Sequence, residues 1–509
     1  MKVLFIILPY ITYEKKYAQR SFLTMPYGVL SITTYIKDIA DVKIFDCNLY
    51  DKYEDVLCKT LKEFNADVYG INLMFDRSYQ YLDDIVAMVK HYNYMASIII
   101  GGAAVTYNYE QILKHDPFID AVCYGEGEEP IRDYLLLCKF NENFATYNNM
   151  HPIKSITHDL DKCIDIDYSY IDIEVYQKHI EEAYSPYIHG MDGKRQFIIV
   201  SSRGCPYSCT FCMNSLNPDK KVRYASVDSI INHVEKLIEL YGMNVLTFYD
   251  DQILHDKERA LELFTRLKPY NLRIEMPNGV NISALNEDII RTMKEAGVDS
   301  LYLALESGSK KVLKAMKKPV SLTKTKEIIQ LLRKYDYYIF CFIVVGMPEE
   351  TDEDRLETIE YLREIKPDNI SPKVASPVYG SLLRKECIEK GYLKDIPFGR
   401  FEMTDSLIKT ENNKPEDMLK HALYMNYRTN FIENYRMEIG DYITARHYFQ
   451  HVVNKHPNEI FGHLYLGVSM IHTGEEPEKI IEQWNLMHDL YEKNERNERE
   501  KFNYFGLEL

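Results

Sequence analysis

Three closely spaced cysteines constrain this chain more than any other feature of its sequence. Cys205, Cys209 and Cys212 follow the spacing C-x3-C-x2-C, and an aromatic residue, Phe211, directly precedes the third. The apolar run at residues 197–200 predicts a buried parallel strand, so the cysteines fall on the loop at its carboxyl end. Three thiolates on one short loop can hold a cubane iron–sulfur cluster by three of its irons, which leaves the fourth iron open.

A structural zinc site is the alternative for such a loop. Structural zinc usually takes four protein ligands from cysteine and histidine, often in closely spaced pairs. No fourth cysteine or histidine lies near the three in sequence, and the other seven of the ten cysteines are scattered singly. This usage is typical of a reduced, cytoplasmic protein rather than of a disulfide framework. The sequence therefore favours the cluster.

The first part of the chain, residues 1–140, alternates apolar strands with amphipathic helices such as the one predicted at residues 53–64. Strands are predicted at residues 3–8, 42–45, 68–73, 97–100 and 121–123. This alternation predicts an α/β fold with a parallel, doubly wound, Rossmann-like sheet. Ligands of such sheets bind at the carboxyl ends of the strands.

The same alternation returns in residues 193–395, after a polar segment at residues 141–192 that we interpret as a linker containing one short helix. Six strands are predicted at residues 197–200, 245–249, 275–279, 300–304, 338–345 and 369–374. They predict a partial (β/α)6 barrel with its chemistry at the carboxyl ends of the strands.

The last part, residues 396–509, is charged and helical. Within it, residues 430–490 resemble a tetratricopeptide (TPR) repeat followed by a degenerate second copy, which includes Gly467 and Trp484. About three repeats are needed for an independent solenoid. We therefore expect a helical cap on the barrel or a dimer surface, with a docking site for a protein partner as the alternative.

Composition excludes some classes of function. The net charge of −16 argues against a broad nucleic-acid surface. No apolar stretch is long enough for a transmembrane helix, and the apolar run at residues 3–8 lacks the length and cleavage site of a signal peptide. We expect a cytoplasmic protein without a membrane partner.

The cysteine trio resembles that of the radical S-adenosylmethionine (SAM) superfamily. The resemblance implies a 4Fe–4S cluster whose open iron is chelated by SAM, and reductive cleavage of SAM to a 5′-deoxyadenosyl radical. Strand ends of the predicted barrel match the segments that contact SAM in this superfamily. The implied SAM-binding residues are Phe211, Tyr249, Asp250, Glu306, Ser307, Gly308, Val344 and Gly346.

The first part of the chain resembles the cobalamin-binding domain that precedes many radical enzymes. No G-x-G-x-x-G motif opens its first helix, which lowers the odds of a dinucleotide, and glycines at strand ends let a bulky ligand approach the backbone. Taken singly, these positions also fit tight turns. The implied cobalamin-binding residues are Tyr27, Gly28, Asn72, Leu73, Gly101, Gly102, Ala103, Gly125, Glu126, Gly127 and Glu128.

The position of the first histidine bears on how cobalamin would be held. Many cobalamin proteins ligate cobalt from below with the histidine of a D-x-H-x-x-G loop. Here the first histidine is His91, in the helix predicted before the fourth strand. We therefore expect cobalamin without a histidine lower ligand.

Residues 1–395 as a whole resemble cobalamin-dependent radical SAM enzymes. The resemblance implies methyl transfer to an unactivated carbon or to phosphorus of a small-molecule or peptide substrate, with an electron donor such as flavodoxin or ferredoxin. It also predicts that the strand ends of the first domain pack over the open end of the barrel.

Three alternatives stay open. The first is radical cyclisation or ring rearrangement without methyl transfer. The second is a tRNA methylthiotransferase, although Cys47, Cys58 and Cys123 lack an obvious shared site for its second cluster. The third is a non-catalytic scaffold that binds through the helical tail.

Overall fold

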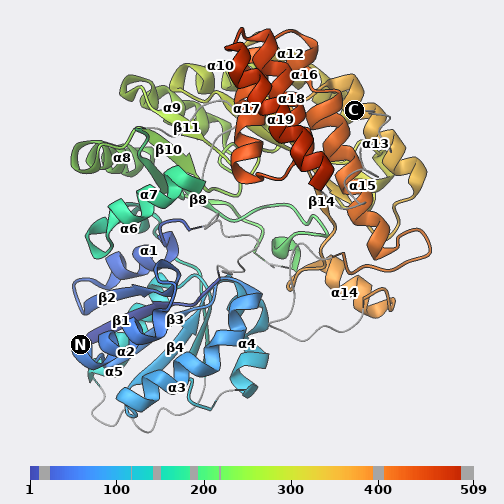
Figure 1. Cartoon of the computed structure of the whole chain (residues 1–509). Helices are drawn as coiled ribbons and strands as arrows, with labels where there is room; N and C mark the ends of the chain where they lie inside the picture. The colour runs from blue at the N-terminus through green and yellow to red at the C-terminus, as the bar shows by residue number, and fades with distance from the viewer. Residues whose placement is uncertain are drawn as a thin grey trace.

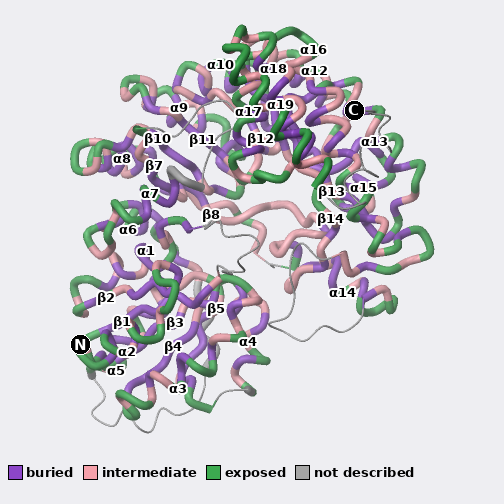
Figure 2. Tube along the Cα trace, viewed as in Figure 1, coloured by how far each residue is buried: buried purple, intermediate pink, exposed green. Residues whose placement is uncertain are grey.

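The computed structural model describes residues 1–10, 23–115, 117–140, 151–183, 193–216, 219–393 and 406–493. A sheet flanked by helices forms the lower part of the molecule in Figure 1, a partial barrel lies above it, and the carboxyl-terminal helices lie at the top and right, away from the first sheet. The strands form the buried interior of both α/β units (Figure 2). The predicted α/β fold class is confirmed.

The first sheet is entirely parallel, in the order β2-β1-β3-β4-β5-β6. Its strands are β1 (Lys2–Ile7), β2 (Asp41–Asp46), β3 (Val68–Asn72), β4 (Ser97–Gly101), β5 (Ala121–Gly125) and β6 (His151–Ser155). Its helices are α1 (Tyr27–Ile36), α2 (Tyr53–Phe64), α3 (Leu82–Tyr92), α4 (Ala103–His115) and α5 (Glu128–Phe140). Helices cover both faces, which explains why β1 is a continuous apolar run.

The sixth strand is a correction to the sequence analysis, which assigned residues 141–192 to a linker. Residues 151–155 instead extend the sheet by pairing with β5. As an edge strand β6 tolerates Pro152, which cannot donate a backbone hydrogen bond. Helices α6 (Asp161–Ile164) and α7 (Ile173–Ala183) follow, and α7 is the short helix predicted there. Residues 141–150 and 184–192 of that segment lie outside the described residues.

Six parallel strands form the partial barrel as two three-stranded sheets joined by isolated bridges between Ile274 and Val298 and between Val280 and Leu303. The strands are β7 (Gln196–Ile199), β10 (Val245–Phe248), β11 (Arg273–Glu275), β12 (Ser300–Glu306), β13 (Tyr338–Val345) and β14 (Asn369–Val374). The helices are α8 (Val227–Tyr241), α9 (Lys257–Leu267), α10 (Glu287–Ala296), α11 (Lys310–Ala315), α12 (Leu322–Lys334), α13 (Asp352–Ile365) and α14 (Leu382–Glu389).

The carboxyl-terminal helices begin on the barrel itself. They are α15 (Pro415–Tyr427), α16 (Tyr435–Glu438), α17 (Tyr442–Lys455), α18 (Ile460–His472) and α19 (Pro477–Lys493). Met418, Ala422 and Met425 of α15 belong to the apolar core of the barrel, whereas α17–α19 enclose a separate core. Because α15 closes the barrel beside β14, the structure supports the helical-cap interpretation of this region.

No helix among the described residues is long and apolar enough to cross a membrane.

Candidate active site

The three cysteines lie on the loop that follows β7, and all three are half-buried. The backbone N–H of Thr210 donates to the carbonyl of Met316 (2.9 Å), and the Thr210 carbonyl accepts from Leu383 N–H (2.8 Å). The Sγ of Cys209 lies 3.9 Å from the carbonyl oxygen of Lys317. The loop is therefore held between the segment that follows α11 and the start of α14.

The donor set of this loop fits a cubane cluster. All ten cysteines are free thiols, so none of the three is consumed by a disulfide. Among the described residues, no three His, Cys, Asp or Glu side chains converge on one ion. Three thiolates on one loop suit a cubane, in which each cysteine ligates a different iron. Burial raises the pKa of the Cys209 thiol to about 11, and ligation would overcome this because a metal ion deprotonates a coordinating thiol.

Asp250, two residues after the end of β10, supports the start of the cysteine loop. Its carboxylate accepts hydrogen bonds from Ser201 N–H (2.8 Å), Ser201 Oγ (2.6 Å) and Ser202 Oγ (2.6 Å). Burial raises its pKa to about 6 against the opposing effect of these donors. The side chain therefore fixes the backbone that precedes the cysteines. The implied contact of Asp250 with SAM stays a prediction, and the same holds for Tyr249, whose N–H donates to the carbonyl of Ile199 (3.0 Å).

The segment after β12 combines one charged pair with a hydroxyl network. Glu306 has a left-handed backbone (φ +69°), and its carboxylate accepts from Lys318 Nζ at 2.9 Å. Both side chains are largely buried. The hydroxyls of Ser307 and Thr358 lie 3.1 Å apart, and Gly308 N–H donates to Thr358 Oγ1. Glu306 and Lys318 are thus charged groups near the cysteines, whereas the hydrogen bonds of Ser307 and Gly308 attach the segment to α13.

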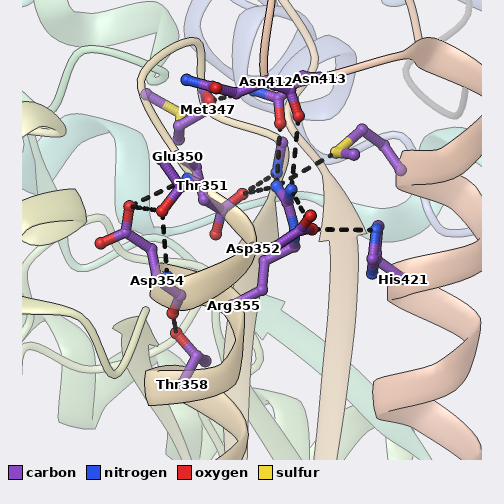
Figure 3. Close-up of polar contacts among 12 residues, drawn as sticks. Met347, Glu350, Thr351, Asp352, Asp354, Arg355, Thr358, Asn412, Asn413 and His421 are labelled. Carbon is purple, nitrogen blue, oxygen red and sulfur yellow. Dashed lines mark hydrogen bonds and ion pairs between the residues drawn. The ribbon is translucent and has the colours of Figure 1, made fainter.

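Contacts among Glu350, Arg355 and Asn413 hold the turn after β13 in place (Figure 3). The backbone N–H of Gly346 donates to Glu350, whose carboxylate lies 3.5 Å from the guanidinium of Arg355. Asn413, from the segment before α15, donates from Nδ2 to the Met347 carbonyl (2.6 Å) and accepts from Arg355 (2.9 Å). Burial raises the pKa of Glu350 to about 7. This turn carries Gly346, which the sequence implicates in SAM binding.

Phe211 and Val344 are far apart in sequence but belong to the surroundings of one apolar cluster. Both pack, half-buried, against this cluster, which contains Met316 and Met347. One side of the cysteine loop is thus apolar, next to the turn after β13. This is a suitable surface for a planar aromatic ring.

The predicted cobalamin residues of β3 and β4 also meet. Asn72 pairs in register with Gly101, and Leu73 N–H donates to the Gly101 carbonyl (2.8 Å). Gly102 has φ +121°, and a Cβ there would lie 2.4 Å from the Leu73 carbonyl oxygen. Only glycine fits this turn. Ala103 follows as the first residue of α4, so these residues lie together at the carboxyl ends of β3 and β4, and their contact with cobalamin stays a prediction.

Tyr27 and Gly28 begin α1, between the two α/β units. The hydroxyl of Tyr27 accepts from Val200 N–H (3.3 Å) in the barrel, and burial raises its pKa. Nothing lies within 4 Å of a Cβ built on Gly28. Tyr27 therefore contacts the segment that leads to the cysteines, and Gly28 borders open space.

The Gly125–Glu128 turn contacts other parts of the protein, and its implied role in cobalamin binding stays a prediction. Gly125 N–H donates to Thr106 Oγ1 (3.1 Å), and Gly127 lies beside Ile32. The carboxylates of Glu126 and Glu128 bind Arg203 in the cysteine loop, and Glu126 also binds Arg223. These two carboxylates therefore attach the turn to the segment that leads into the cysteines.

Sequence reasoning missed Arg203 and Arg223 as site residues. Arg203 stands two positions before Cys205, and two glutamates in a strand-end turn require cations when they are buried. The need of these glutamates for positively charged partners was the one sign in the sequence that arginines belong to this site. The arginine partners themselves lie 75 or more residues away in sequence.

The two α/β units meet through their strand ends. Besides the ion pairs, Tyr107 of α4 donates to Asn214 Oδ1 (3.4 Å) beyond the cysteines, and its ring lies against Gly380 in the loop after β14. The carboxyl ends of β4, β5, β7 and β14 are thus involved in one interface. The predicted packing of the first domain over the open end of the barrel is confirmed.

Two family models match the chain. The model of the radical SAM superfamily matches residues 199–362, which include the three cysteines, and the model of the B12 binding domain matches residues 18–135.

Similar sequences include two methyltransferases and a cyclase. The chain is 25% identical over 407 residues to an uncharacterised methyltransferase of Pyrococcus horikoshii, covering 78% of this chain and 85% of the relative. It is 28% identical over 385 residues to the cytidylyl-2-hydroxyethylphosphonate methyltransferase of Streptomyces wedmorensis, covering 68% and 71%. It is 23% identical over 451 residues to the anaerobic magnesium-protoporphyrin IX monomethyl ester cyclase of Rubrivivax gelatinosus, covering 85% and 78%.

Among solved structures, the cobalamin-dependent SAM radical enzyme OxsB, with aqua-cobalamin and SAM bound, superposes with a TM-score of 0.67 at 14% identity. The match covers 100% of this chain and 81% of OxsB. At this identity the likeness establishes a shared fold.

Proposed function

Because the chain belongs to the cobalamin-dependent radical SAM enzymes, we propose that it transfers a methyl group to an unactivated carbon or to phosphorus of a small-molecule or peptide substrate. As a member of this family it takes a 4Fe–4S cluster, SAM and cobalamin as cofactors. When bound, the cluster and SAM supply a carbon-centred radical, and cobalamin carries the methyl group.

The observation that carries the proposal is the meeting of the two sets of strand ends. Methyl transfer requires the methyl donor and the radical source to reach one substrate. In this chain the residues proposed for the cobalamin edge and the cysteine loop belong to units joined directly by the Arg203–Glu128 pair. The similarity to two named methyltransferases supports methyl transfer.

We assign the roles of individual residues as follows. Cys205, Cys209 and Cys212 would ligate the cluster, and Asp250 would hold their loop. Phe211, Val344 and Gly346 would receive the adenine of SAM, with Glu306 and Tyr249 nearer its polar groups. Asn72, Leu73, Gly101, Gly102 and Ala103 would form the cobalamin edge.

The test uses SAM with a deuterated methyl group and the full chain, reconstituted anaerobically with iron, sulfide and cobalamin under a strong reductant. We expect trideuteromethyl-cobalamin together with S-adenosylhomocysteine, measured by mass spectrometry. The Cys205→Ala variant is the control, since it should lose production of 5′-deoxyadenosine. Production of 5′-deoxyadenosine by the wild-type chain without any methylated cobalamin would contradict methyl transfer.

That contradicting outcome would favour a second candidate function, radical cyclisation without methyl transfer. The similarity to the magnesium-protoporphyrin ester cyclase over 85% of this chain supports this candidate.

We also propose a cytoplasmic location and a flavodoxin or ferredoxin as electron donor. The free state of all ten cysteines supports a reducing compartment. Reduction of the cluster by purified flavodoxin, followed by its absorbance, would test the donor, and failure with both proteins would exclude this part of the proposal.

A further inference from the structure

We propose that Arg203 is a positioning residue, which Glu126 and Glu128 of the first domain hold in order to fix the cysteine loop against the cobalamin edge. The inference rests on the proposed function, because it assumes that both cofactors bind. It changes the role of the Gly-Glu-Gly-Glu turn from ligand contact to domain attachment. Arg203, Glu126 and Glu128 are called the latch below.

Several hydrogen bonds fix the geometry of the latch. Arg203 donates from Nη2 to Glu128 Oε1 (2.6 Å) and from Nη1 to Glu128 Oε2 and Glu126 Oε2 (3.2 Å each). Glu128 is held in turn by Ser31 Oγ (2.7 Å), from α1. A bidentate contact between arginine and carboxylate fixes direction as well as distance. The pair therefore sets the orientation of the backbone that leads into Cys205.

A second arginine, Arg223, adds a positive charge that the carboxylates of the first domain must balance. After β7 the chain folds back as an antiparallel ribbon of β8 (Ser202–Arg203) and β9 (Arg223–Tyr224), in which Arg203 lies directly opposite Arg223. Like charges in such a pair repel each other. Glu126 Oε2 lies 3.2 Å from Nη1 of Arg203 and 3.1 Å from Nη1 of Arg223, so it pairs with both arginines, and together with Glu128 it balances their two positive charges. Without the first domain, this ribbon would present two unpaired cations.

Burial makes the latch sensitive to the loss of either partner. The Arg203 side chain is 16% exposed and that of Glu128 only 4%. Removal of one member of a buried pair leaves an uncompensated charge, which is strongly destabilising. A change at Glu128, in the first domain, should therefore displace the cysteine loop in the barrel.

The experiment compares Glu128→Gln, Arg203→Gln and Arg203→Lys in the full chain with cluster and cobalamin. The control is Arg195→Gln, which removes a pair with exposed Glu174 at the opposite end of β7. The readouts are iron content, the electron paramagnetic resonance (EPR) spectrum of the reduced cluster, and the dissociation constant for cobalamin. None of these readouts requires a substrate.

We expect Glu128→Gln and Arg203→Gln to retain iron but to broaden the cluster spectrum in the same way. Arg203→Lys should give an intermediate spectrum, because lysine keeps the positive charge but cannot make the bidentate contact with the carboxylate. The Arg195→Gln control should match wild type. Cobalamin affinity should stay within about twofold for Glu128→Gln.

Unchanged spectra in the three latch variants would overturn the inference. So would a tenfold weaker affinity in Glu128→Gln alone, since Glu128 would then be a cobalamin contact. If the Gln variants fail to fold, the spectrum of Arg203→Lys decides alone. Failure of the proposed function is distinguishable, because the wild-type chain would then lack the cluster spectrum or bind no cobalamin.

Discussion

At the scale of single residues, the buried carboxylate of Asp250 holds the backbone before the cysteines in place through hydrogen bonds. Asp250 accepts three hydrogen bonds from the two residues that precede Arg203. Resemblance alone identified Asp250 as a SAM contact. Its donors could not be predicted, because Ser201 and Ser202 lie 48 or more residues away. The cysteines, by contrast, were predictable from local spacing.

We expect Asp250→Asn to destabilise the protein. An amide nitrogen cannot accept from the serine hydroxyls, and a buried donor left unsatisfied costs about 1–3 kcal/mol. Chemical denaturation of the variant, with iron content after reconstitution, measures both effects. Unchanged stability together with full iron content would show that the carboxylate does not support the loop.

Glu350 gives a pH prediction. Burial raises its pKa from about 4.5 to about 7, so the neutral form is favoured in the folded state. The contribution of Glu350 to stability is therefore complete below about pH 4.5 and falls as pH rises to about 7. The wild-type chain should lose stability relative to Glu350→Gln across this window. Denaturation midpoints of both proteins between pH 5 and 8 test this, and a difference that stays constant with pH would contradict it.

At the scale of elements, local chemistry sets several boundaries. The capping box of Thr351 and Asp354 fixes the start of α13. The third barrel strand was predicted at residues 275–279, but β11 ends at Glu275 because Pro277, Asn278 and Gly279 favour a turn. The edge strand β6 was missed because its stability comes from pairing with β5 rather than from an apolar pattern.

The turn after β13 leads to a prediction for Asn413. Loss of its hydrogen bonds to Met347 and Arg355 should loosen the turn that carries Gly346. We expect Asn413→Ala to raise the dissociation constant for SAM about tenfold, which corresponds to about 1.4 kcal/mol, without loss of iron. Exposed Asn412 provides the matched control, Asn412→Ala. Equal SAM affinities in the two variants would exclude a role for the carboxyl-terminal segment in the SAM site.

At the scale of the whole molecule, domain order was predictable from the two alternating patterns, but the attachment of the domains was not. The contacts of Tyr27 with Val200 and of Glu128 with Arg203 join residues 173 and 75 positions apart. No local pattern specifies such pairs. Resemblance suggested that the strand ends face one another, and the ion pairs explain physically how they are held.

The most direct test of this account is the magnetic interaction between its two cofactors. Cob(II)alamin bound to the full chain is paramagnetic, and so is the reduced cluster. If both lie over one shared cavity, reduction of the cluster should broaden the cob(II)alamin EPR signal and speed its relaxation. Cys205→Ala, loaded with cobalamin, should show no such change. A cob(II)alamin signal that is identical with oxidised and reduced cluster would contradict the shared site, and with it methyl transfer to a radical formed in the barrel.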